Sequence, residues 1–301
     1  MKYLNFWRNL MEKENCKIES AIKTIVIVFF LVYGLHYFGY FLRARYYNFI
    51  GNLSLSEGVH HVFQYLGHLV YLIVYIFYIW IVKDDRKYFL SAFKENAGKN
   101  IIKALAGALL GFCLMGICIF AASAHGDISV GSPSGTDMTL FLFAFIAVFI
   151  QASIEEVETR GFVFDKMKDG GVPVKWAIVV SSFFFTYLHA TNPGFGFLPL
   201  LSIFIVGIQY VLIYHYFGNL WITFAAHAMW NFTQDFIFGL PDSGKPAAVS
   251  IFNTTVSNSS FFYDKDFGIE GSMMAILVNA AVCVIVLVIG NYLKRQQKEQ
   301  A

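Results

Sequence analysis

Charged residues and cysteines are scarce in this sequence. Asp, Glu, Lys and Arg make up only 14% of the 301 residues, whereas soluble domains carry about 25%. The four cysteines form no CxxC pair and no disulfide framework, and three of them lie within apolar runs. The formal charge is only +2 and no basic tract is present, so no nucleic-acid partner is expected. This composition excludes an ordinary soluble domain and a disulfide-rich secreted scaffold.

Long apolar runs, by contrast, dominate the chain, which is 57% hydrophobic. The runs are continuous and about 20 residues long, as membrane-spanning helices require, whereas strands of membrane barrels alternate in segments of about 10 residues. We therefore predict an all-α polytopic membrane protein, a bundle of about eight transmembrane helices in the lipid bilayer of a cell membrane. The spans are expected at 21–42, 62–82, 101–123, 139–165, 174–190, 197–217, 219–238 and 272–293.

The distribution of Lys and Arg predicts the orientation, because these residues are enriched in cytoplasmic loops. Of the 22 basic residues, the N-terminal segment has five, residues 83–103 six, residues 160–175 four and the C-terminus three. Only Arg43, Arg45, Lys245 and Lys265 fall on the opposite side. Both termini are therefore expected to be cytoplasmic, with the first span acting as a retained signal anchor rather than a cleaved peptide.

The spans suggest three parts. Residues 1–100 are interpreted as N-terminal membrane helices followed by a cytoplasmic segment, 83–100, which is either an amphipathic interfacial helix or a solvated loop. Residues 101–240 hold the next five predicted spans and form the catalytic core that the family resemblance given below implies. Residues 241–301 are interpreted as an outer loop and the last transmembrane helix.

Ionisable side chains within the predicted spans are functional candidates, because a charge in hydrocarbon is costly. They are Glu155, Glu156, Glu158 and Arg160 in the fourth span, His189 at the end of the fifth, and His227 and Asp235, with the polar Asn231, in the seventh. His36 and His68 have only uncharged polar neighbours on their own helices, which favours a structural role. His61 is interpreted as a loop residue at the membrane boundary, and Glu158 is expected near cytoplasmic water.

Spacing separates the two adjacent glutamates. Glu156 and Arg160 are four residues apart and can neutralise each other on one helical face. Glu155 points about 100° away, on a polar stripe with Gln151 and Thr159. At 1.5 Å per residue, Glu155 lies about 20 Å from the turn at 168–173.

His189, His227 and Asn231 lie at depths similar to that of Glu155. We therefore expect the four side chains to meet in a cavity open to the cytoplasm. A carboxylate and an imidazole in such a cavity can activate water, and a second histidine and an asparagine can stabilise an oxyanion. Glu155, His189 and His227 are equally a possible zinc set, although no HExxH motif is present. Spacing alone leaves both mechanisms open.

Three motifs then carry a resemblance to a known family. Glu155-Glu156-x-x-x-Arg160, Phe185-x-x-x-His189 and His227-x-x-x-Asn231 occur in this order. The chain thus resembles the CAAX-processing and bacteriocin-processing (CPBP, or Abi) family, whose eukaryotic relatives are the type II CAAX prenyl endopeptidases. The resemblance implies an eight-helix intramembrane endopeptidase in which Glu155 and His189 activate water. It also implies that His227 and Asn231 bind the oxyanion, and that Glu156 and Arg160 support the site.

Several functions remain open at this stage. The favoured one is hydrolysis of membrane-associated peptides or proteins in a bacterial plasma membrane. It needs no cofactor, because an asparagine suits an oxyanion better than it suits zinc. The alternatives are a zinc-dependent version of the same protease, a non-catalytic bacteriocin self-immunity protein with the same fold, and a transporter with a buried acid. The absence of internal repeats disfavours the transporter.

Overall fold

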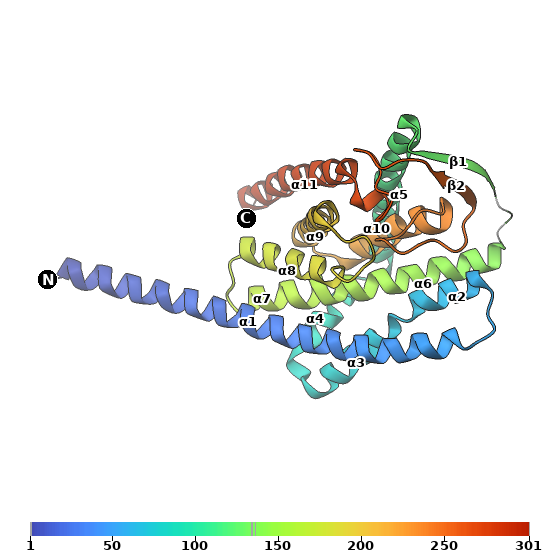
Figure 1. Ribbon diagram of the computed structural model, residues 1–301. Helices are drawn as coiled ribbons and strands as arrows, with labels where there is room; N and C mark the ends of the chain where they lie inside the picture. The colour runs from blue at the N-terminus through green and yellow to red at the C-terminus, as the bar shows by residue number, and fades with distance from the viewer. Residues whose placement is uncertain (1, 134, 136, 301) are drawn as a thin grey trace.

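The computed structural model describes residues 2–133, 135 and 137–300, with side chains from residue 17 onward, and is almost entirely helical (Figure 1). The α-helices are α1 (Lys2–Gly51), α2 (Glu57–Leu66), α3 (Leu69–Ile81), α4 (Arg86–Phe89), α5 (Ala97–His125), α6 (Met138–Glu156), α7 (Asp165–Asp169), α8 (Val174–Leu188), α9 (Phe197–Phe217), α10 (Leu220–Phe232) and α11 (Met273–Glu299). The shorter elements are the 3₁₀ turns η1 (Lys83–Asp85), η2 (Leu90–Phe93) and η5 (Ile269–Gly271), the π-helices η3 (Val157–Phe164) and η4 (Thr233–Ile237), and the strands β1 (Ile128–Pro133) and β2 (Phe252–Val256).

Six helical segments in the described part of the chain are long and apolar enough to cross a membrane. They are Lys17–Gly51, Glu57–Ile81, Ala97–His125, Met138–Asp169, Phe197–Phe217 and Met273–Glu299. The protein is therefore a multi-pass membrane protein. The expected fifth and seventh spans correspond to shorter helices, α8 with 15 residues and α10 with 13 residues. The total of eight spans and the orientation of the termini remain predictions.

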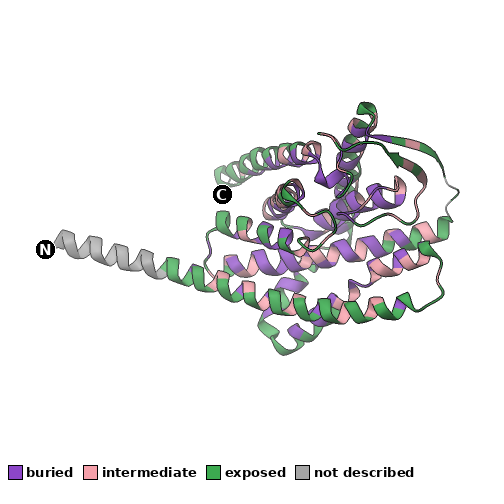
Figure 2. Cartoon of the chain, in the orientation of Figure 1, coloured by how far each residue is buried: buried purple, intermediate pink, exposed green. Residues whose placement is uncertain are grey.

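The outward faces of the long helices are apolar. Phe30 on α1, Trp80 on α3, Phe120 on α5 and Val288 on α11 are all more than 60% exposed. Figure 2 shows the same contrast along α1 and α11, where exposed residues predominate, whereas buried residues gather on the inner helices. In water such a surface would aggregate, so this exterior suits lipid.

Helix α10 lies at the centre of the bundle, packed between α5 and α6. Ten of its 13 residues are buried. The close approach of α5 depends on glycine, because a Cβ added at Gly107 or Gly111 would lie 2.1 Å from the carbonyl oxygens of Ile222 or Ala226. Small residues commonly permit such close helix packing in membranes. This packing fixes the position of the HxxxN motif carried by α10.

Helix α6 continues into α7 through the π-helix η3, which begins immediately after the two adjacent glutamates. Single π turns within α-helices are frequent at functional sites. Seven of the eight η3 residues are buried. Ser181 on α8 donates a 2.7 Å hydrogen bond to the carbonyl oxygen of Thr159, so α8 is anchored directly to this irregular turn.

Two segments differ from the sequence expectations. The loops around 124–138 and 239–271 contribute β1 and β2, which pair antiparallel with Ile128 opposite Val256. Residues 83–100 form the short turns η1, α4 and η2 rather than one amphipathic helix, and Tyr88 and Phe89 are buried against Phe162 instead of being solvated. Both differences arise because the partners are distant in the sequence.

Candidate active site

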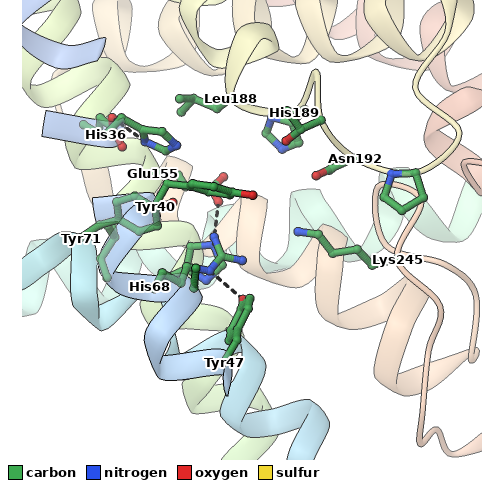
Figure 3. A pocket seen from close by; sticks show the side chains of 16 residues that line it. His36, Tyr40, Tyr47, His68, Tyr71, Glu155, Leu188, His189, Asn192 and Lys245 are labelled. Atoms are coloured by element: carbon green, nitrogen blue, oxygen red, sulfur yellow. Dashed lines mark hydrogen bonds and ion pairs between the residues drawn. The ribbon is translucent and has the colours of Figure 1, made fainter. Parts of the chain in front are cut away.

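A polar pocket of about 280 Å³ lies between α1, the α2–α3 junction, α6 and the loop after α8 (Figure 3). Its polar lining residues include His36, Arg43, His68, Glu155, Glu158, His189, Asn192 and Lys245. The pocket therefore brings together two of the four expected catalytic residues, Glu155 and His189. His227 and Asn231 are not part of its lining.

Only one of the two carboxylate oxygens of Glu155 has a hydrogen-bond partner among the described residues. Its Oε1 accepts a 2.6 Å hydrogen bond from Gln151 Nε2, one helical turn earlier, and lies 3.5 Å from His68 Nε2. Its Oε2 is buried and has no hydrogen-bond partner among the described residues, with His227 Nε2 3.9 Å away. An unsatisfied buried carboxylate oxygen is costly unless water or substrate reaches it. This oxygen is therefore available to a hydrogen-bond donor from water or from a bound molecule.

His189 ends α8, and its Nδ1 lies 2.9 Å from the carbonyl oxygen of Phe185. This hydrogen bond assigns the proton to Nδ1 and leaves Nε2 free as an acceptor. The ring of Phe185 also stacks against the guanidinium of Arg160, at 4.3 Å. Phe185 thus connects the FxxxH motif to the EExxxR motif.

Glu156 and Arg160 form an ion pair of 3.0 Å, and both side chains are fully buried. The same Glu156 oxygen, Oε1, also lies 3.0 Å from His227 Nδ1. Glu156 therefore orients the His227 ring so that Nε2 faces Glu155. Arg160 donates further bonds to Thr159 Oγ1 at 2.5 Å and to the carbonyl oxygen of Gly207 at 3.3 Å.

Asn231 lies behind the pocket rather than in its wall. Its Nδ2 donates a 3.3 Å hydrogen bond to Gln151 Oε1. Because Gln151 in turn donates to Glu155, the amide of Asn231 is linked to the carboxylate through one intermediate side chain. In this arrangement Asn231 positions Gln151 and does not point into the pocket.

His68 lines the same pocket as Glu155, and its ring is hydrogen-bonded within the bundle, as its interpretation as a structural residue requires. Its Nδ1 hydrogen-bonds to the carbonyl oxygen of Tyr65 at 3.0 Å, and its Nε2 lies 3.2 Å from Arg43 NH1. Spacing along one helix could not reveal the charged neighbours of His68, because Arg43 lies on α1 and Glu155 on α6. The available signal was the presence of an ionisable group inside an apolar span.

Glu158 is placed differently from the expectation, next to His36. Glu158 is 2% exposed, so it does not face bulk water. Its Oε1 lies 3.3 Å from His36 Nδ1, and the His36 ring stacks on Tyr71 at 4.6 Å. The two side chains meet across α1 and η3 and line the pocket together.

Asp235 belongs to a separate cluster. It accepts hydrogen bonds from His61 Nε2 at 2.7 Å and from the Tyr65 hydroxyl at 2.6 Å. The same hydroxyl lies 2.6 Å from Asp242. His61 is therefore a buried, paired histidine and not the loop residue that the sequence analysis expected. The π-helix η4, which carries Asp235, brings it to α2 rather than to Glu155.

Zinc at a catalytic site is commonly held by three protein ligands and a water. In the described part of the chain, no group of three His, Cys, Asp or Glu side chains is placed to hold a metal ion. Glu155, His189 and His227 therefore do not form a preassembled zinc site of the kind that three protein ligands give.

The depth of the pocket can be measured along α1. Thr24 Oγ1 donates a 3.2 Å hydrogen bond to the carbonyl oxygen of Gly170, at the turn between α7 and α8. At 1.5 Å per residue, His36 lies about 18 Å and Arg43 about 28 Å beyond that turn, in a hydrocarbon core about 30 Å thick. The pocket thus extends from mid-depth toward the opposite side. With the 168–173 turn on the cytoplasmic side, as predicted, these lining residues lie nearer the outer side, which disfavours the expected opening to the cytoplasm.

The comparisons with known proteins agree with the motifs. Residues 137–233, which include all three motifs, match the family model described as type II CAAX prenyl endopeptidase Rce1-like. No curated protein matches the chain. The matched family implies a protease, and therefore a peptide substrate and a lipid environment. The resemblance expected from the sequence is thereby confirmed: residues 137–233 of this multi-pass membrane protein are similar to the type II CAAX prenyl endopeptidase Rce1-like family.

Proposed function

We propose that the protein is an intramembrane endopeptidase that hydrolyses membrane-associated peptides by means of a water molecule activated at Glu155. Glu155 Oε2 takes a proton from the water, and His189 Nε2 accepts the second hydrogen bond of that water. The resulting hydroxide attacks the scissile carbonyl carbon, and the proton is then given to the leaving amine. The observation that carries the proposal is the unsatisfied Oε2 of Glu155 beside a pocket shared with His189.

The oxyanion that forms on the carbonyl needs hydrogen-bond donors. We propose His227 and Asn231 for this role, as the family resemblance implies. His227 Nε2 already faces Glu155. Asn231 has to release its bond to Gln151 before its amide can reach a substrate. Glu156 and Arg160 support this arrangement by fixing His227 and η3.

The proposed mechanism uses no metal ion. It is supported by the placement of the side chains, because Glu155, His189 and His227 are not among any group of three possible ligands that could hold a metal ion in the described part of the chain. The zinc-dependent version and the non-catalytic immunity protein are the competing hypotheses. We also propose that residues 101–240 form the catalytic core, with 1–100 and 241–301 completing the pocket through Arg43, His68 and Lys245.

Substrate is proposed to enter from the side opposite the termini. This follows from the depth of the pocket together with the predicted cytoplasmic position of the basic 160–175 segment. A single cysteine at Lys168 would then be labelled from the cytoplasm, whereas one at Lys245 would be labelled from outside. The reverse pattern would show that substrate enters from the cytoplasm.

The catalytic proposal is tested with the detergent-purified protein and a panel of quenched fluorescent peptides. Glu155→Gln should reduce cleavage at least 100-fold, the scale of general-base catalysis, whereas Glu57→Gln, an exposed glutamate on α2, should retain full activity. Cleavage should survive a chelator. Activity lost with chelator and restored by zinc would establish the metal-dependent version, and equal behaviour of wild type and Glu155→Gln would support the non-catalytic one.

A further inference from the structure

Two cations line the Glu155 pocket without a carboxylate partner among the described residues. Arg43 donates from Nε to the Tyr47 hydroxyl at 2.7 Å and from NH1 to His68 Nε2 at 3.2 Å, both of which are neutral acceptors. The ammonium of Lys245 makes no hydrogen bond or ion pair in the part of the chain that is described. Arg160, by contrast, pairs with a carboxylate at 3.0 Å.

The two cations lie where two cavities meet. A second pocket of about 280 Å³, lined by His61, Gln151 and Asp242 among others, shares Arg43, Tyr47, His68 and Lys245 with the Glu155 pocket. In Figure 3 the Lys245 side chain points into the Glu155 pocket, toward Glu155 and His189. A peptide extending from one cavity to the other would pass these cations.

A tight turn and a close contact with a neighbouring loop fix the backbone around Lys245. Asp242 and Lys245 exchange both backbone hydrogen bonds at 2.9 Å, which closes a tight turn. Gly244 has a φ of +81°, and a Cβ on it would lie 1.9 Å from the carbonyl oxygen of Pro193. The turn therefore packs directly on the loop that follows His189, and this contact sets the position of Lys245.

The nearest acid does not neutralise Lys245. The Asp242 carboxylate is engaged by the Tyr65 hydroxyl at 2.6 Å and by Gln234 Nε2 at 2.9 Å. Desolvation of its ammonium, together with the charge of Arg43, lowers the pKa of Lys245 below its usual value. Two cations that repel each other at the wall of one pocket are stabilised by a shared anion.

We propose that Arg43 and Lys245 form a subsite that binds a carboxylate of the peptide substrate. The inference rests on the proposed function, because it places that carboxylate beside the scissile bond. A guanidinium and an ammonium bind carboxylates through charge-assisted hydrogen bonds. The subsite also offsets the repulsion that Glu155 exerts on an anionic peptide. The carboxylate is either the C-terminus of the peptide or an acidic side chain.

Binding is measured on the full-length Glu155→Gln protein in detergent, so the result does not depend on cleavage. The probes are three fluorescein-labelled apolar hexapeptides: one with a free C-terminus, its C-terminal amide, and an amide that carries one internal glutamate. A carboxylate-bearing peptide should bind roughly 10- to 100-fold more tightly than the plain amide, the range expected for charge-assisted hydrogen bonds. Which of the two peptides binds tightly identifies the source of the carboxylate.

Added to the same protein, Lys245→Met and Arg43→Gln should each abolish this preference, and Lys245→Arg should preserve most of it. The matched controls are Lys265→Met and Arg45→Gln, which remove cations outside both pockets and should change nothing. Equal binding of all three peptides would overturn the proposal. It would also be overturned if the variants lost binding only to nanodiscs containing phosphatidylglycerol, since the cations would then hold a lipid headgroup. A protein that binds but does not cleave would contradict the proposed function alone.

Discussion

Two adjacent glutamates of this protein have opposite surroundings. Glu156 is fully buried, and one of its oxygens contacts both Arg160 and His227. Glu155 lines a pocket and keeps one oxygen without a partner among the described residues. Removing a partner from a closed ion pair leaves a buried charge, whereas changing an open carboxylate removes chemistry and little stability. The difference separates the side chains that hold the site together from those that are available for reaction.

The largest expected effect on stability follows from removing Arg160 from its ion pair with Glu156. Arg160→Met leaves the Glu156 carboxylate buried without its cation, which should destabilise the protein by about 3–5 kcal/mol. The double variant Glu156→Gln/Arg160→Met should recover part of this loss, and Glu155→Gln should lie within about 1 kcal/mol of wild type. Thermal unfolding in detergent measures all three. A single Arg160→Met variant as stable as Glu155→Gln would remove the distinction between the two glutamates.

A third buried acid, Glu270, extends the comparison, because its protonation should make the stability of the protein depend on pH. Burial raises the pKa of Glu270 to about 7, even though its carboxylate accepts bonds from Trp230 at 2.8 Å and Ser243 at 2.5 Å. Because the folded pKa is raised, the stabilisation is fully present below about pH 4.5 and is lost as the pH rises toward 7, by up to about 3 kcal/mol.

The measurement for Glu270 is the difference in Tm between wild type and Glu270→Gln across this pH range. Wild type should lose stability relative to the variant as the pH rises from about 4.5 to 7, because glutamine has no proton to release. Parallel curves would mean that Glu270 titrates as an ordinary surface acid.

The smallest effect concerns the packing that places His227 beside the glutamates. Gly111→Ala puts a Cβ 2.1 Å from the carbonyl oxygen of Ala226, so α10 has to shift. Overpacking of this kind costs about 1–3 kcal/mol, and cleavage should fall with it because His227 moves. Gly116→Ala, on the same helix with nothing within 4 Å, is the control. Equal Tm and activity for the two variants would show that α5 does not position the site.

The sequence predicted the parts of the site that depend on one helix. The Glu156–Arg160 pair and the contact from Gln151 to Glu155 both follow from a four-residue spacing, and both are present. Contacts between helices were not predictable in this way. The distance from Glu155 to His68 depends on the break at Gly67 between α2 and α3, which an apolar span from 62 to 82 does not reveal.

Irregular backbone accounts for most of the remaining differences. His227, Asn231 and Asp235 are spaced four residues apart and would share one face of an unbroken α-helix, but η4 begins at Thr233. The pairing of β1 with β2 joins segments more than a hundred residues apart, and neither segment has the alternating pattern of a strand. Lys245 reaches the pocket through a loop whose course depends on contact with Pro193. No periodic pattern in the sequence predicts such contacts.

The polar side chains of α10 and η4 have a consequence for how the protein is made. The two elements form one continuous helical segment that carries His227, Asn231 and Asp235, and it is not among the described segments that are long and apolar enough to cross a membrane. Such a segment inserts poorly into the bilayer by itself. It enters the membrane stably only where α5, α6 and α9 already provide its surroundings. The centre of the bundle therefore depends on its neighbouring helices for its place in the membrane.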